Sequence, residues 1–244
     1  LKPPYLPLTV ALLCLFSTSF GQNNWLYYGG SANNDEALAI GQDKFGNIFT
    51  TGYTTGNATF GPASTSTGGN IDMYLTKSDI DGNFIWAVGE GGNAADIGKD
   101  VFVDSNGVSY VTGYFTGSAD FSGSPLVSVG GSKDCYVAKY DASGVLQWVL
   151  PYGGTADEQG SVIHVDSNGD IIVAGWFKGT TDLGASTYTS TIDPLTTIQS
   201  EDIFVMKLDN LGNVLWTKQG VAKYDDYCFG LSIDNSDNIY LSGR

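Results

Sequence analysis

The chain has 244 residues, of which 42% are hydrophobic and 13% aromatic, and this is enough apolar material for a packed core. Its formal net charge of -15 at pH 7 gives a surface that repels a phosphate backbone, so we expect no nucleic-acid partner. The 33 glycines indicate many turns, and short alternating apolar runs outnumber any helical spacing after the N-terminus. Composition and periodicity therefore predict an all-β fold.

Residues 1–21 are predicted to be a signal peptide. Lys2 supplies a weakly positive start, an apolar run follows from Leu8 to Phe16, and small residues precede an expected cleavage before Gln22. The run is too short to cross a bilayer, and no later segment approaches the required length of about 20 apolar residues. We therefore expect export without a transmembrane segment, which leaves the mature protein secreted or at the cell surface.

An internal repeat organises the rest of the chain. The tryptophans Trp25, Trp86, Trp148 and Trp216 are separated by 61, 62 and 68 residues. Three further markers keep a fixed distance from each tryptophan, and this regularity is typical of a repeat architecture. They are an acid 10 places on (Asp35, Asp96, Glu158, Asp226), an aspartate 18 places on (Asp43, Asp104, Asp166, Asp234) and a glycine 27 places on (Gly52, Gly113, Gly175, Gly243).

Each repeat is interpreted as four antiparallel strands. Alternating apolar residues such as Val101 and Val103 end the first strand, and a turn of the type Asp104–Gly107 leads into the second. Aspartate bonds backbone amides in such turns, and glycine adopts the positive φ that other residues resist. The third strand, such as Met73–Lys77, is followed by a second aspartate turn and by the strand that carries the tryptophan. Four antiparallel strands per repeat of this length are typical of a β-propeller blade, with a β-solenoid as the second choice.

The repeat borders predict an incomplete arc of about three and a half blades. We expect the tryptophans to pack between neighbouring blades. Closed propellers have about four to eight blades, so we expect a fragment whose missing C-terminal blades complete the ring. The predicted units are an outer strand at 22–30, blades at 31–90, 91–152 and 153–220, and a partial blade at 221–244.

Three blocks resemble a known family. Tyr28-Gly29-Gly30 to Asp35, Gly46 to Tyr53, and Asp202 to Trp216 resemble the SBBP-type β-propeller repeats of secreted and cell-surface bacterial proteins. The resemblance covers nearly everything from Asn24 onward and implies a propeller fold in an extracellular bacterial protein. It implies no reaction and no catalytic residues. The turn at Asp234 lacks the usual glycine, and Gly89-Glu90-Gly91-Gly92 replaces the Tyr-Gly-Gly pattern.

Residues that recur in every repeat are interpreted as architectural. The series Asp72, Asp134, Asp202 and Lys77, Lys139, Lys207 are predicted to tie strands or turns together. Turns such as Asp79–Asn83 and Asp166–Asp170 offer the oxygen ligands that Ca²⁺ prefers, but they lack the length and the terminal bidentate acid of a calcium loop. We therefore expect no cofactor and no metal, with Ca²⁺ left open. His164, the only histidine, lacks partners for a zinc site or a triad, and Cys135 and Cys228 are expected to be buried free thiols.

The connection between the second and third strands varies in length. It spans 12 places from Phe60 to Asp72, 13 from Phe121 to Asp134 and 19 from Leu183 to Asp202. Loops that vary on a constant scaffold are where binding specificity usually resides, although a solvated insertion without a role stays open. The candidate partner-binding residues are Tyr188, Asp193 and Glu201, and the expected partner is an extracellular protein or glycan.

The main alternative is a carbohydrate-active enzyme, which needs only two carboxylates that face one cleft. The acids outside the repeated positions are Asp120, Asp182, Asp193 and Glu201. Such acids are common in a chain this acidic, so no catalytic residue is assigned. The favoured function is a non-catalytic scaffold or binding module.

Overall fold

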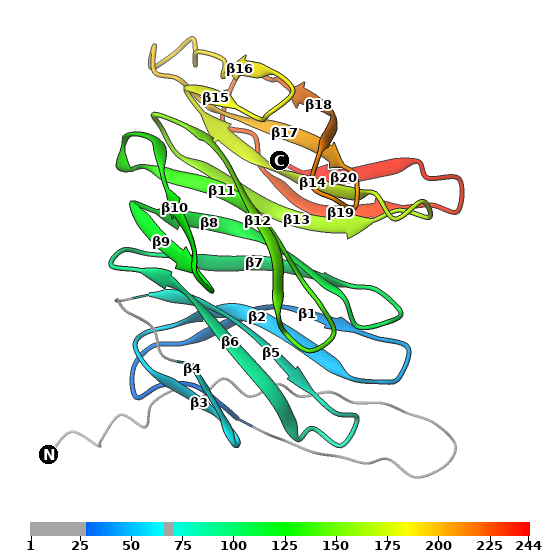
Figure 1. Cartoon of the computed structure of the whole chain (residues 1–244). Coiled ribbons are helices and arrows are strands. Elements are labelled where there is room, and N and C mark those ends of the chain that lie inside the picture. Colours follow the sequence, from blue (N-terminus) through cyan, green and yellow to red (C-terminus); the bar gives the residue numbers. More distant parts are fainter. Residues whose placement is uncertain (1–27, 66–70) are drawn as a thin grey trace, which may run out of the picture.

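The computed structural model describes residues 28–65 and 71–244, so the predicted signal peptide and Trp25 lie outside the described residues. Three antiparallel sheets and a two-stranded sheet follow one another in chain order from blue to red in Figure 1. Blade one holds β1 (Glu36–Gln42), β2 (Ile48–Thr54), β5 (Asp72–Ser78) and β6 (Phe84–Gly92). Blade two holds β7 (Ile97–Val103), β8 (Ser109–Thr116), β11 (Lys133–Tyr140) and β12 (Leu146–Gly154). Blade three holds β13 (Glu158–Val165), β14 (Ile171–Lys178), β17 (Glu201–Leu208) and β18 (Val214–Gly220), and β19 (Cys228–Ile233) with β20 (Ile239–Gly243) forms the partial blade.

The strands of each blade pair in sequence order, so the expected all-β architecture of four-stranded antiparallel blades in an incomplete arc is confirmed. A bulge in the first strand of each unit sits beside the recurrent glycine of the second strand. In blade two the register shifts between Gly98 and Asp100, opposite Gly113. A Cβ at Gly113 would lie 1.8 Å from the backbone oxygen of Ile97, so this close approach requires glycine.

A short hairpin interrupts each connection between the second and third strands, and the sequence interpretation did not contain it. The reason is physical, because each hairpin pairs with the outer strand of the preceding unit, far away in the sequence. The bridges are Gly30 with Thr59, Gly91 with Asp120, and Gly153 with Asp182. The hairpins are β3–β4 (Ala58–Phe60, Ala63–Thr65), β9–β10 (Ser118–Phe121, Ser124–Val127) and β15–β16 (Thr180–Asp182, Thr187–Thr189).

The hydrophobic core lies between the blades. Phe49, Val111 and Phe121 belong to one cluster that joins blades one and two, and a second cluster joins blades two and three. Trp86 meets Phe49 edge-on at a centroid distance of 5.7 Å and donates its Nε1–H to the backbone oxygen of Ala142 in the next blade at 3.3 Å. The expected packing of this tryptophan between blades is confirmed.

Trp148 lies against the corresponding turn one blade further on, although its buried Nε1–H has no hydrogen-bond partner among the described residues. A Cβ at Gly212, in the third-to-fourth-strand turn of blade three, would lie 3.7 Å from the Trp148 ring. The recurrent lysines also bridge turns, as expected. Lys207 Nζ lies 2.6 Å from Asp166 Oδ2 and 3.0 Å from Asp170 Oδ2, whereas Lys77 donates to Ala142 of the next blade at 3.3 Å.

The aspartate turns close on themselves. Asp104 Oδ1 accepts the N–H groups of Asn106 at 2.8 Å and Val108 at 2.9 Å. In the turn that lacks glycine, Asp237 takes the positive φ of 60° in its place, a conformation that aspartate tolerates better than most residues. Cys135 and Cys228 are both buried free thiols, as expected. No helix in residues 28–65 and 71–244 is long and apolar enough to span a membrane.

Candidate functional site

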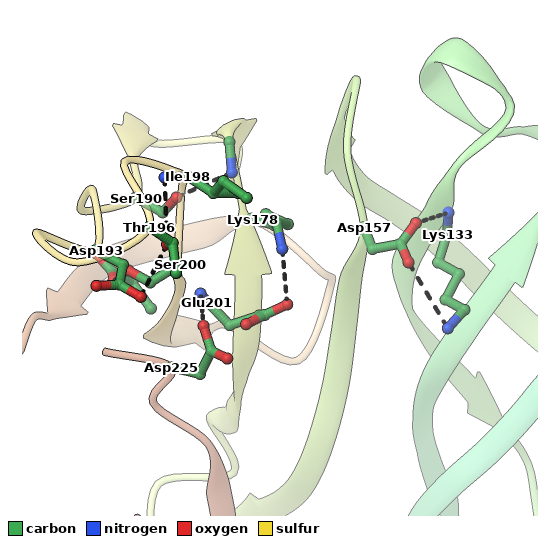
Figure 2. A network of polar contacts seen from close by, with 12 residues as sticks. Lys133, Asp157, Lys178, Ser190, Asp193, Thr196, Ile198, Ser200, Glu201 and Asp225 are labelled. Atoms are coloured by element: carbon green, nitrogen blue, oxygen red, sulfur yellow. Dashed lines mark hydrogen bonds and ion pairs between the residues drawn. The ribbon is translucent and has the colours of Figure 1, made fainter. Parts of the chain in front are cut away.

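The variable segments lie on one side of the blades, which we call the connection face. It comprises the described parts of residues 55–71, 117–132 and 179–200, between the second and third strands. The hairpins take up most of the first two connections. The connection of blade three continues beyond its hairpin as a loop from 190 to 200, which we call the long loop and which Figure 2 shows with its neighbours.

The repeated aspartate at the start of the third strand anchors the segment before it. Asp202 is fully buried, and its Oδ2 accepts the N–H of Thr191 at 3.0 Å while its Oδ1 accepts the Thr191 hydroxyl at 2.8 Å. Gln219 donates to the same carboxylate at 2.7 Å. In blade two, Asp134 Oδ2 accepts the N–H of Val129 at 3.0 Å. These contacts agree with the architectural role expected for Asp134 and Asp202.

Asp193 holds the tip of the long loop in a defined turn. Its Oδ1 accepts the N–H of Leu195 at 2.7 Å, and its Oδ2 accepts the Thr196 hydroxyl at 2.9 Å. The N–H of Thr197 closes onto the Asp193 carbonyl at 2.8 Å. The hydrogen bond from Leu195 lowers the pKa of Asp193, so this carboxylate is committed to the turn.

The same turn exposes three aliphatic side chains. Ile192, Leu195 and Ile198 are 62%, 78% and 61% exposed. They come from seven successive positions of the long loop, and its backbone is tied down at both ends by the contacts of Thr191 and Ser200. The result is an apolar tip on an ordered loop.

Tyr188, in contrast, packs into the scaffold. It lies on β16, its ring centroid is 6.5 Å from that of Phe177, and its hydroxyl shares a hydrogen bond with Thr217 Oγ1 at 2.9 Å. The ring is only half exposed. The structure thus separates Tyr188 from the tip that Asp193 shapes.

Glu201 belongs to a charged cluster at the junction of blade three with the partial blade. Lys178 Nζ lies 3.1 Å from Glu201 Oε1, and the N–H of Glu201 donates to Asp225 Oδ1 at 3.2 Å. Burial, followed by the hydrogen bond with Asp225, raises the pKa of Glu201, and the same bond lowers the pKa of Asp225. Asp225 therefore caps the backbone of Glu201, and Lys178 pairs with the Glu201 carboxylate.

The repeated acid at the start of the first strand is buried at the first two junctions, as Asp96 and Glu158. Asp96 accepts the N–H groups of Gly92 at 2.7 Å and Thr116 at 3.1 Å, and Glu158 accepts that of Gly154 at 3.0 Å. Burial raises the pKa of Asp96 to about 7 and that of Glu158 to about 8. These acids link the end of one blade to the start of the next.

The four acids considered for catalysis do not converge. Asp120 accepts the N–H of Gly123 at 3.0 Å and Asp182 that of Gly184 at 2.8 Å, so each closes its own hairpin turn. Only Asp182 of the four lines a cavity of about 260 Å³, together with Asp134. Within the described part of the chain, no three His, Cys, Asp or Glu side chains gather as a metal-ligand group.

The sequence interpretation missed several residues of this face. Lys178 and Asp225 come from separate segments, and a repeat alignment gives no sign that they meet Glu201. Asp134 was interpreted as architectural, and not as a binding residue, because an aspartate recurs at its position in every repeat. The aliphatic spacing at Ile192, Leu195 and Ile198 within a Ser- and Thr-rich loop was the signal that could have revealed the apolar tip.

Comparison with known proteins supports the propeller architecture. The family model of the SBBP beta-propeller repeat matches residues 23–57. The chain is 22% identical over 197 residues to an uncharacterized WD repeat-containing protein, L264, of Acanthamoeba polyphaga mimivirus, covering 70% of this chain and 14% of that protein. It is 29% identical over 128 residues to the regulatory protein FlaEY of Caulobacter vibrioides, covering 52% of this chain and 13% of that protein.

The chain therefore spans about an eighth to a seventh of these relatives. Among solved structures, a protein of unknown function from Bacteroides caccae matches with a TM-score of 0.45 and 10% identity, over 88% of this chain and 55% of that one.

Proposed function

Because residues 23–57 are a β-propeller repeat of the SBBP family, we propose that this chain is a non-catalytic propeller module of an exported or cell-surface bacterial protein. Its connection face binds a protein partner through the long loop. The N-terminal apolar run, read as a signal peptide, and the acidic composition support the extracellular location.

The observation that carries this proposal is the apolar tip. Aliphatic side chains held in water by a fixed loop are unfavourable, and burial against a partner surface stabilises the complex by roughly 25 cal/mol per Å² of apolar area. Glycans are bound mainly by polar and aromatic groups, whereas this tip is aliphatic. The tip therefore favours a protein over a glycan as the partner.

The state of the acids supports a non-catalytic role. Asp120, Asp182 and Asp193 each accept hydrogen bonds from their own turns, and Glu201 is tied to Lys178 and Asp225. A glycosidase pair needs two carboxyl groups about 5 to 9 Å apart across an open substrate cleft.

The experiment is a binding screen of the purified chain against cell-surface proteins and surface glycans, with matched variants. The double variant Leu195→Asp with Ile198→Asp charges the tip. Leu211→Asp is the control, because Leu211 lies in a tight turn outside the connection face and is 78% exposed, as Leu195 is.

We expect protein ligands to bind the wild type and the control equally, and to lose at least about tenfold in affinity for the double variant. Protein binding that survives the double variant, or binding of glycans alone, would overturn the proposal. Circular dichroism and thermal melting of all three proteins establish that the fold is retained.

A further inference from the structure

A cavity opens on the connection face where blade two meets the hairpin of blade three. Its volume is about 260 Å³, which is enough for one side chain or a small organic molecule. The lining comes from β10, the segment after it, β11 and β12 of blade two, and from β15 and the turn after it in blade three. The lining residues are Val127, Val129, Asp134, Pro151, Tyr152, Gly153, Asp182 and Gly184.

The polar groups of the cavity are acidic. Asp134 is only 2% exposed, and its Oδ2 is engaged by the N–H of Val129, but its Oδ1 accepts no hydrogen bond from any residue that the structure describes. A buried acceptor without a donor costs free energy, about 1–3 kcal/mol, which a ligand donor recovers. Asp182 is exposed at the rim, with one oxygen committed to Gly184.

The charge of the surroundings favours a cation. Burial raises the pKa of Asp134 to about 6, so this carboxyl is mostly ionised at pH 7. The neighbouring acid Asp157 adds negative potential, and the nearby cation Lys133 is paired with Asp157 at 3.7 Å. No lysine, arginine or histidine belongs to the cavity lining.

The remaining wall is apolar. Val127 is 70% exposed and Val129 is 47% exposed, and Pro151 and Tyr152 of β12 line the same cavity. An aliphatic stem can lie along such a wall while its charged end reaches the acids.

We propose that this cavity binds a primary ammonium group on an aliphatic stem, namely a lysine side chain of the protein partner. The ammonium has three donors, of which Asp134 Oδ1 and the Asp182 carboxylate take two, and its stem lies against Val127, Val129 and Pro151. This inference rests on the proposed binding function and specifies one contact that the apolar tip does not provide.

The junction of blades one and two has the same backbone pairing but a different side chain beside its hairpin. There Glu90 stands where Tyr152 stands in blade two, and its carboxylate accepts the N–H of Ser122 at 2.7 Å, which ties the β9–β10 hairpin to β6. Asp120 pairs with Gly91 as Asp182 pairs with Gly153, yet Asp120 does not line the cavity. Asp120 is therefore a matched control for Asp182.

The test titrates Nα-acetyl-lysine N-methylamide into the isotope-labelled full chain at pH 7 and follows the backbone amide NMR signals. We expect saturable shifts centred on Val129, Gly153 and Gly184. Asp134→Asn and Asp182→Asn should each weaken binding about tenfold or more, in keeping with a lost charge-assisted hydrogen bond, and Asp120→Asn should not change it. The norleucine analogue, which lacks the ammonium, should give no saturable shift.

Absence of saturable shifts with the lysine probe, or equal affinity in Asp182→Asn and Asp120→Asn, would overturn the proposal. Asp182 is exposed, so its variant stays informative if Asp134→Asn does not fold. The same variants also test the two proposals independently of each other. The variant with a charged tip should keep its affinity for the lysine probe while it loses the partner, and a partner that binds unchanged to Asp182→Asn contradicts the cavity but not the tip.

Discussion

The second and third blade junctions have the same backbone contact and opposite charge arrangements. In each, the first residue of the third strand donates its N–H at 3.2 Å to the acid before the next blade's first strand, Lys133 to Asp157 and Glu201 to Asp225. In the second junction the side chains then form an ion pair at 3.7 Å. In the third, an acid faces an acid, and Lys178 supplies the cation from the neighbouring strand at 3.1 Å. Figure 2 shows the two arrangements together.

The difference shows how a repeat protein separates stability from surface chemistry. The backbone contacts, the packing of the tryptophans and the buried acids recur, so they fix the blades. The charge of the side chain at the start of the third strand differs between the junctions, positive at Lys133 and negative at Glu201, without a change in the fold. Each substitution below either removes one of these recurring contacts or changes only a variable side chain.

Removal of the Trp148 side chain should have the largest effect on the unfolding free energy, because it removes a recurring contact between blades. The ring covers the Gly212 turn of the next blade and belongs to the partly buried residues around the second core cluster. Trp148→Ala should destabilise the chain by about 3 kcal/mol, the lower end for such a truncation because the ring is half-buried. Urea unfolding measures this, with Trp216→Ala as the control.

Trp216 occupies the same place in blade three, but no turn glycine of a later blade covers it among the described residues. Its truncation should therefore cost less in this chain. Equal losses of unfolding free energy for the two variants would mean that contact with the next blade contributes little.

The buried acid of the second junction should make stability depend on pH. Burial raises the pKa of Glu158 to about 8 from its ordinary 4.5, so the folded state keeps a proton that the unfolded chain releases. This contribution is complete below pH 4.5 and is lost as the pH rises through about 8. Glu158→Gln keeps an acceptor for the Gly154 N–H but cannot ionise. We expect it to match the wild type near pH 5 and to exceed it by about 1–3 kcal/mol at pH 9.

The corresponding acid of the third junction, Asp226, provides the comparison. Burial raises its pKa as well, but its side chain is only half-buried. Asp226→Asn should therefore gain less than Glu158→Gln between pH 5 and pH 9 in denaturant unfolding. A wild-type stability that does not fall over this range would contradict the buried, protonated state of Glu158.

The sequence predicts those parts of the molecule that repeat. Turns such as Asp104–Gly107, the tryptophan contacts and the four strands per blade follow from local spacing, because each is encoded within a few residues and recurs. The hairpins were not predictable in this way. A strand of three residues such as β3 has too little pattern to detect, and its pairing partner belongs to the preceding unit.

The candidate site was predictable only in outline. The length of the third connection pointed to the long loop, and Asp193 and Glu201 do lie in or beside it. The contacts that give Glu201 its properties, from Lys178 and Asp225, depend on how three separate segments meet. Asp134 shows a further limit, since a residue that recurs for architectural reasons also lines the cavity.

The smallest expected effect comes from the variable side chains. Lys133 and Asp157 are 38% and 44% exposed, so Lys133→Gln should cost at most about 0.5 kcal/mol. Lys178→Gln should cost more, about 1 kcal/mol, because it leaves Glu201, whose side chain is 14% exposed, beside Asp225 without its cation. The loss should shrink as the pH falls and Glu201 becomes protonated, since its pKa is already raised. Urea unfolding of both variants at pH 5 and pH 8, in low and in high salt, measures these differences. If Lys133→Gln and Lys178→Gln lose the same free energy at pH 8, the two junctions are electrostatically equivalent and the comparison drawn between them fails.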